Sequence, residues 1–347
     1  MKHNFLKPLL LALTIGFFFA SCSSDDDGGV TPELPQGDFD LGYIIANEGN
    51  FGSPNASVSF IDADLMTVEN SIFEAVNPSE NLGDVLNHIA FGDENAFLVM
   101  NNSNKIVVVN RFSFEYVTTL TESIALPRYA VVENGKLFVS NSQSQDIAVY
   151  DTSDFSFITS IAIDKPVELL KADAGKLFVQ NASFGTGNEI TVINTDTNEI
   201  TSTLTVDGVL NSIDDEDGIL YALHSEGISK FNTSTASLIE TINFSGEVNN
   251  PSKLNIEDDK IFFITGSQVY ASDLNATEIG VTPLFDTEVE GNSFTVGYGF
   301  SVENGNIFYS DVNGFTADSE LLIYDYSGNL VQTLTTGVGT NAVYFND

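Results

Sequence analysis

The stretch Tyr129-Ala-Val-Val-Glu-Asn-Gly135-Lys-Leu-Phe-Val-Ser-Asn141 predicts a strand, a tight turn and a second strand. Asn134-Gly135 has the positive-φ residues that a two-residue hairpin turn requires. Val, Leu and Phe, which favour strands, fill the runs on both sides of the turn. Copies of this unit recur along the chain at 94–101, 174–181, 217–224, 258–265 and 304–311. The chain is therefore built from a repeated β unit.

Each copy is followed by a loop, a third strand and a fourth strand. Examples of the third strand are 147–151 and 190–194, and examples of the fourth are 157–161 and 200–204. Four short strands repeated about every 40–46 residues are typical of β-propeller blades. Helical periodicity is almost absent, which excludes a helical solenoid.

The number of second strands predicts seven blades. These strands end at Asn47, Asn101, Asn141, Asn181, His224, Thr265 and Asp311. The first has no partner upstream, but residues 341–347 align with 128–134, the innermost strand of the third blade. We therefore predict an all-β, seven-bladed propeller that the C-terminal strand closes. The alternative is six blades plus an insert, because the sixth repeat is degenerate and segment 280–298 is long.

The N-terminus predicts export and a lipid anchor. Residues 1–21 have two lysines and an apolar run of about twelve residues, which suits a signal peptide and is too short to span a bilayer. Phe19-Ala20-Ser21-Cys22 resembles the lipoprotein box, in which the cysteine is acylated. Cys22 is the only cysteine, so it has no internal disulfide partner. The alternative is an ordinary signal with a chance cysteine.

Residues 22–39 are polar and rich in Gly and Pro, which predicts a lipidated, disordered tether before a propeller over 40–347. The acidic run 25–27 resembles the signal that sends Bacteroidetes lipoproteins to the outer face of the outer membrane. The alternative is a solvated spacer. Twelve Lys and Arg against 49 Asp and Glu give a net charge of −37. Such a charge repels phosphate backbones and anionic lipids, so we expect no nucleic-acid partner and membrane contact through the anchor alone.

The repeats are similar to YVTN-type seven-bladed propellers, on the motif Gly-Lys-Leu-Phe-Val followed by Val-Tyr-Asp-Thr. The segments 47–52, 55–60 and 127–129 further resemble propeller lipoproteins on the surface of Bacteroidetes. That group includes lipoproteins that capture cobalamin above a TonB-dependent transporter, and relatives implicated in siderophore capture. The resemblance implies a cell-surface lipoprotein of the outer membrane that captures cobalamin or another corrinoid and passes it to such a transporter.

Catalytic motifs are scarce in the chain. It has three histidines and lacks the common signatures of zinc, haem, nucleophilic-elbow and phosphate-loop sites. We therefore predict no enzyme and no cofactor, although lactonase-type enzymes also use seven-bladed propellers. A metal site is left open, since no clean calcium loop is present. A non-catalytic adhesive or protein-binding propeller is the alternative from a different functional class.

The blade alignment predicts a polar cup at one end of the central channel. One residue per blade should lie at the channel mouth, and asparagines and phenylalanines should lie just outside. We predict ligand contacts from His88, Arg128, Glu168, Asn211, Ser252, Tyr298, Asn341, Asn101, Asn141, Asn181, Phe51 and Phe184. Asn offers both donors and acceptors, which suits an amide-fringed corrinoid, whereas an anionic siderophore would need the local cations. For any single Asn, capping of its own loop is the competing interpretation.

Overall fold

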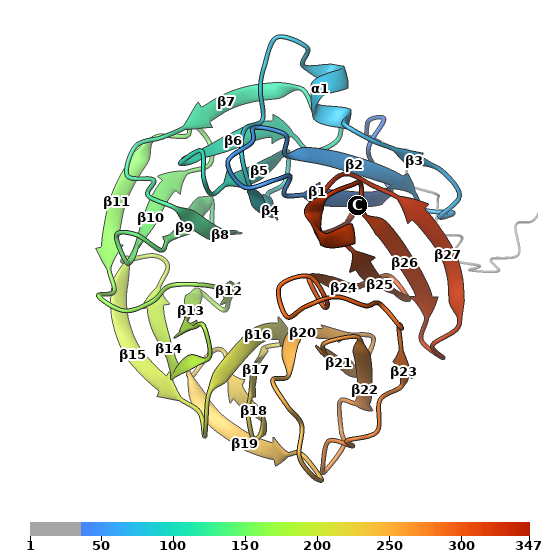
Figure 1. Ribbon diagram of the computed structural model, residues 1–347. Helices are drawn as coiled ribbons and strands as arrows, with labels where there is room; N and C mark the ends of the chain where they lie inside the picture. The colour runs from blue at the N-terminus through green and yellow to red at the C-terminus, as the bar shows by residue number, and fades with distance from the viewer. Residues whose placement is uncertain (1–35) are drawn as a thin grey trace, which may run out of the picture. The chain divides into compact units, whose positions relative to one another are not determined.

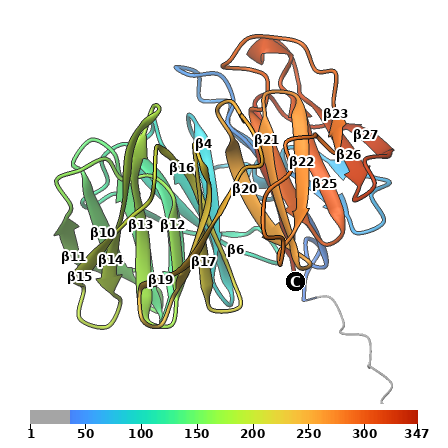
Figure 2. The same ribbon diagram turned by 90° about the horizontal axis from the view of Figure 1, so that it is seen from below.

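Seven four-stranded antiparallel sheets form a β-propeller in the computed structural model, which describes residues 36–347 (Figure 1). The sheets are arranged around a central axis, and their strands run roughly along it (Figure 2). The seven-blade prediction is confirmed and the six-blade alternative is wrong. No helix within residues 36–347 is long and apolar enough to cross a membrane.

Each blade is named in chain order, with its innermost strand first. Blade one comprises β28 (Thr340–Asn346), β1 (Gly42–Asn47), β2 (Ser57–Asp62) and β3 (Val68–Glu69). Blade two comprises β4 (Leu86–Phe91), β5 (Asn95–Met100), β6 (Lys105–Asn110) and β7 (Tyr116–Leu120). Blade three comprises β8 (Pro127–Glu133), β9 (Lys136–Asn141), β10 (Asp146–Asp151) and β11 (Phe157–Ala162). Blade four comprises β12 (Leu170–Asp173), β13 (Lys176–Ser183), β14 (Thr186–Asn194) and β15 (Glu199–Thr205).

The remaining blades follow the same order. Blade five comprises β16 (Leu210–Glu216), β17 (Ile219–His224), β18 (Gly227–Asn232) and β19 (Ser237–Asn243). Blade six comprises β20 (Ser252–Glu257), β21 (Lys260–Thr265), β22 (Gln268–Asp273) and β23 (Phe285–Asp286). Blade seven comprises β24 (Gly299–Glu303), β25 (Asn306–Asp311), β26 (Glu320–Asp325) and β27 (Leu330–Thr335). Two short helices, α1 (Ile72–Val76) and η1 (Asn313–Phe315), lie in connections.

The degenerate sixth repeat is a real blade with a weak outer edge. Its fourth strand, β23, has two residues, and the chain from 287 to 298 forms no regular strand. That irregular connection runs from the outer edge of blade six toward the central channel. The sequence irregularity therefore marks a long loop and not a missing blade.

The C-terminal strand closes the ring as predicted. β28 pairs antiparallel with β1, with Val343 opposite Ile45 and Phe345 opposite Tyr43. Apolar side chains of β28 enter a cluster with blade seven, including Phe308 and Ile323. Figure 1 shows the C-terminus beside β1. Pairing with β28 covers the edge of β1 that would otherwise be open, so blade one has four strands.

The predicted tether extends too far toward the propeller. Phe39 is buried against Phe60 and Phe114, and its N–H donates to the carbonyl oxygen of Phe112 at 2.9 Å. Burial of a large aromatic side chain holds this segment to blades one and two. The last residues of the 22–39 segment therefore belong to the folded part. Residues 1–35, with Cys22 and the predicted signal peptide, lie outside the described residues.

Candidate ligand-binding site

A cavity of about 1390 Å³ follows the propeller axis and is lined by the innermost strands of all seven blades. We call its two ends the mouth, where these strands begin, and the base, where they end. Glu48, Asn87, Arg128 and Glu168 lie at the mouth, and Glu303 lies at the base. A cavity of this size exceeds the roughly 300–1,000 Å³ usual for drug-sized ligands.

β-Bulges direct polar side chains into the mouth. The pairing of the innermost strand shifts register near its start in blades one, two, three, five and six. A bulge adds one residue, bends the strand and re-aims a side chain. In blade two the extra residue is Asn87, between Leu86 and His88. In blade six the bulge contains Lys253, whose φ of 54° lies in the left-handed region.

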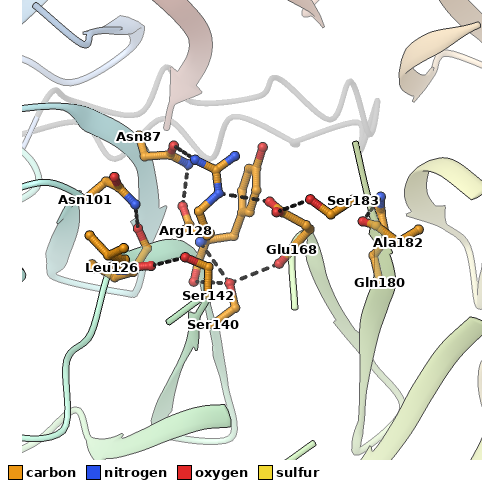
Figure 3. A network of polar contacts seen from close by, with 12 residues as sticks. Asn87, Asn101, Leu126, Arg128, Ser140, Ser142, Glu168, Gln180, Ala182 and Ser183 are labelled. Atoms are coloured by element: carbon orange, nitrogen blue, oxygen red, sulfur yellow. Dashed lines mark hydrogen bonds and ion pairs between the residues drawn. The ribbon is translucent and has the colours of Figure 1, made fainter. Parts of the chain in front are cut away.

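Arg128 is the centre of a polar network at the mouth (Figure 3). Its Nε donates to Glu168 Oε2 at 2.9 Å, and its Nη1 donates to Asn87 Oδ1 at 2.9 Å. Ser183 Oγ donates to the other Glu168 oxygen at 2.9 Å. The network spans blades two, three and four, and it neutralises the guanidinium with one carboxylate.

A second network surrounds Glu48 and meets the first at Asn87. Its carboxylate accepts hydrogen bonds from the Tyr298 hydroxyl and from Asn341 Nδ2, the latter at 2.9 Å. Asn341 Nδ2 also contacts the carbonyl oxygens of Leu86 and Asn87 at 3.0 Å. Tyr298 packs edge-on against Phe315, with ring centroids 4.8 Å apart. Burial, and next the charge of Glu48, raise the pKa of Tyr298, so this hydroxyl stays protonated.

Three phenylalanines form an exposed rim around the mouth. Phe51, Phe184 and Phe294 line the cavity, yet Phe51 is 80% exposed, Phe294 is 81% exposed and Phe184 is fully exposed. They come from loops of blade one, blade four and the 287–298 connection. Exposed large apolar side chains at the edge of a cavity are candidates for contact with a ligand or a partner.

The base of the cavity is acidic. Lys171 forms ion pairs with Asp214 and Asp215, and Glu257 and Glu303 also line the cavity there. Burial, and next the charge of Glu257, raise the pKa of Glu303 to about 8. Within residues 36–347, no three His, Cys, Asp or Glu side chains are grouped to hold a metal ion.

Most of the predicted ligand-binding residues line this cavity. They are His88, Arg128, Glu168, Asn211, Ser252, Tyr298, Asn341, Asn101, Phe51 and Phe184. His88 lies one position deeper than predicted, with its ring against Tyr129 and Tyr344. Burial, and next the charge of Lys171, lower the pKa of His88 to about 3, so it is neutral.

The other two asparagines predicted to bind ligand hydrogen-bond to connections within the propeller. Asn141 Nδ2 donates to the Ser123 carbonyl oxygen and Asn181 Nδ2 to that of Pro166, both at 2.9 Å. Both side chains are buried, and neither lines the cavity. Asn101 lines the cavity but also caps a connection, donating to the Pro127 carbonyl oxygen at 2.8 Å. The loop-capping interpretation describes these amides, and ligand contacts from Asn141 and Asn181 are not supported.

Three residues of the site were missed by sequence analysis: Glu48, Asn87 and Phe294. Lys253 was expected among the cations on this face of the propeller, but not among the ligand contacts. Asn87 and Lys253 are each adjacent to a predicted residue. In both strands the bulge moves the side chain that points into the cavity by one position along the chain. Glu48 lies within the segment 47–52 that carried the family resemblance, which is the one signal that pointed to it. Phe294 lies in an irregular loop and had no repeat to place it.

Comparison with known proteins identifies the family. The chain matches the model of a domain of unknown function, DUF5074, over residues 41–343, and therefore belongs to this family of β-propellers. A search among curated proteins finds no match.

Solved structures share the fold at low identity. A quinoprotein alcohol dehydrogenase-like protein from Bacteroides thetaiotaomicron is 13% identical with a TM-score of 0.67, over 89% of this chain and 79% of that one. A functionally unknown protein from Desulfotomaculum acetoxidans is 11% identical with a TM-score of 0.66, over 88% and 98%. A protein from Lactobacillus plantarum is 13% identical with a TM-score of 0.65, over 89% and 100%. At these identities the likeness concerns the propeller fold alone.

Proposed function

We propose that this protein captures a bulky, polar organic ligand at the mouth of its central cavity and does not transform it. The observation that supports this proposal most is the exposed rim of Phe51, Phe184 and Phe294 around a ring of hydrogen-bonded polar side chains. The apolar rim would contact the faces of a large ligand, and the ring would meet its polar edge. A site built on a closed ring of sheets is largely preformed, so binding orders few groups.

The proposal of a binding protein rather than an enzyme rests on how the polar groups are engaged. Arg128 with Glu168, and Glu48 with Tyr298, are hydrogen-bonded to one another. His88 is held neutral and packed between aromatic rings. Such pairs suit recognition, because an acid, base or nucleophile must have its reactive atom free to reach a substrate.

The ligand class that we favour is a corrinoid such as cobalamin. Arg128 and Lys253 balance Glu48 and Glu168 at the mouth, and the base beyond is acidic. This balance favours a ligand without net negative charge, and amide groups fit the Asn and carboxylate acceptors. Siderophore capture is weaker, since catecholate ferric complexes are strongly anionic and the mouth has no excess of cations.

The cellular role that we propose follows the family resemblance and the N-terminal sequence. Acylated Cys22 would hold the propeller at the outer membrane, facing the exterior, and the captured ligand would pass to a TonB-dependent transporter. Stable attachment by lipid alone requires more than one acyl chain, as bacterial lipoproteins have.

Calorimetry with cyanocobalamin and with several ferric siderophores tests the ligand. We expect micromolar or tighter binding of cyanocobalamin, and Phe184→Ala and Phe294→Ala should each weaken it by more than about 1 kcal/mol. The control is Ile239→Ala on the outermost strand of blade five, where the side chain is 52% exposed and far from the cavity lining. Loss of affinity in the control as well would point to a general effect on folding.

A protein-binding propeller is the second candidate, and the same exposed rim favours it. Three phenylalanines in solvent also suit the hydrophobic centre of a protein interface. Absence of binding to every corrinoid and siderophore, with the wild-type protein folded, would favour that candidate. Binding that survives both rim substitutions would preserve the function and relocate the site.

A further inference from the structure

Lys253 differs from every other cation of the described propeller. Residues 36–347 contain ten Lys and Arg, and nine of them form a side-chain hydrogen bond or an ion pair. The Lys253 ammonium forms neither with any described residue. In a chain of net charge −37, a cation without a partner is unexpected, because carboxylates outnumber cations about fourfold.

The position of Lys253 explains why no carboxylate reaches it. It lies in the bulge of β20 with φ at 54°, and its side chain lines the cavity. Glu48, the acid whose charge acts on Lys253, already accepts hydrogen bonds from Tyr298 and Asn341. Burial lowers the pKa of Lys253, the charge of Glu48 opposes this, and the charge of Arg128 lowers it further. Lys253 is half-buried, and a partly desolvated ammonium without a partner costs stability that a bound anion would restore.

Two acceptors that also lack partners line the same cavity, one from blade one and one from blade four. Asn341 Oδ1 and Gln180 Oε1 are buried and make no hydrogen bond among the described residues. Their side chains are 7% and 5% exposed, and both residues line the cavity. A buried acceptor without a donor is costly, so each is suited to an N–H from a ligand.

We propose that Lys253 binds a single anionic oxygen group of the captured ligand, a phosphodiester or a carboxylate, while Asn341 and Gln180 accept hydrogen bonds from amide N–H groups of the same ligand. This proposal rests on the proposed function of the mouth and adds the chemistry that it recognises. The ligand is then zwitterionic or neutral overall, because one cation is unpaired at the mouth and the base repels further negative charge.

The first test does not depend on the identity of the ligand. Full-length protein in detergent is reductively methylated with ¹³C-formaldehyde, which labels lysines and keeps their charge. The Lys253 signal is the one that disappears in Lys253→Arg. We expect dimethyl phosphate or acetate to shift it saturably, while the other lysines, already paired, stay unchanged. A response to dimethyl phosphate identifies a phosphodiester as the anionic group of the ligand, and a response to acetate identifies a carboxylate. No saturable shift, or the same shift in all lysines, would overturn the proposal.

The second test uses two corrinoids that differ in the anionic group. Cyanocobalamin has a phosphodiester, and dicyanocobinamide has none. The wild type should bind cyanocobalamin at least about tenfold more tightly, or about 1.4 kcal/mol. Lys253→Met should remove this preference, and Lys253→Arg should retain part of it. Equal preference in the wild type and Lys253→Met contradicts the role of Lys253. If the wild type binds neither corrinoid, the corrinoid function fails, and the lysine spectra alone decide the anion site.

The stability of Lys253→Met separates a binding role from a structural one. Replacing an unpaired, half-buried cation with an apolar side chain of similar length should leave the unfolding midpoint unchanged or raise it. A clear fall of the midpoint would show that the ammonium supports the fold and would contradict its assignment to a ligand.

Discussion

Val343→Ala should destabilise the propeller far more than the same change at Val331. Val343 is 2% exposed in β28, opposite Ile45, and its backbone N–H donates to Ser301 Oγ of blade seven at 3.0 Å. Loss of two methyl groups costs about 1.6 kcal/mol at about 0.8 kcal/mol each. A residual cavity of about 40 Å³ would add about 1 kcal/mol. We therefore expect a loss of about 2.5 kcal/mol.

Val331 is the matched control because it lies on β27, the outermost strand of blade seven, and is 55% exposed. Its substitution should change the free energy of unfolding by less than about 0.5 kcal/mol. Guanidinium unfolding followed by far-ultraviolet circular dichroism measures both variants. Deletion of residues 340–347 should destabilise the whole ring. Equal, small effects of the two substitutions, or an unchanged midpoint after the deletion, would refute the reasoning that β28 closes the ring.

Three further predictions concern the network, the base and the anchor. Arg128→Ala should lower the free energy of unfolding by about 1–3 kcal/mol, because the Glu168 carboxylate loses its charged donor. In a double-mutant cycle measured in denaturant, the double variant with Glu168→Ala should lose less stability than the sum of the two single losses. The pKa of Glu303 is raised from 4.5 to about 8 by burial and by the charges of Glu257 and Asp214, against the Phe345 N–H and the charge of Lys171. Between these pH values the folded protein holds a proton on Glu303 that the unfolded chain releases. Its contribution to stability is thus present at low pH and is lost as pH rises from about 4.5 through 8; Glu303→Gln should flatten that part of the pH profile, and an unchanged profile would contradict it. Cys22→Ala should release folded protein into the aqueous phase in a detergent partition, whereas retention of the variant at the outer membrane in high salt would disprove the anchor.

The blade repeats were predictable because their signals are local. Asn134-Gly135 specifies a hairpin wherever the flanking residues alternate correctly, and the same turn appears in the structure between β8 and β9. Closure was also predictable. Segment 341–347 matches an innermost strand, and the strand that begins at residue 41 has no innermost strand before it in the sequence.

The composition of the mouth could be predicted only in part. A bulge adds a residue without changing the hydrophobic pattern. The repeat alignment therefore selected His88, although Asn87 is the residue that contacts Arg128, and it selected Ser252, the neighbour of Lys253. The role of an asparagine depends on its partners across the chain, and Asn141 meets the Ser123 carbonyl oxygen only after the blade has folded. Phe294 lies in a connection that has no counterpart in other blades, so no repeat indicated its place.

The pairing of β28 with β1 also sets the order in which the molecule can fold. Blades two to seven each contain consecutive strands, so each can form from local hairpins as the chain is made. Blade one must wait for residues 340–346, which lie almost three hundred positions from its next strand. Joining ends so far apart costs roughly 5 kcal/mol of chain entropy. Completion of blade one is therefore the step of highest contact order, and we infer that it limits the folding rate.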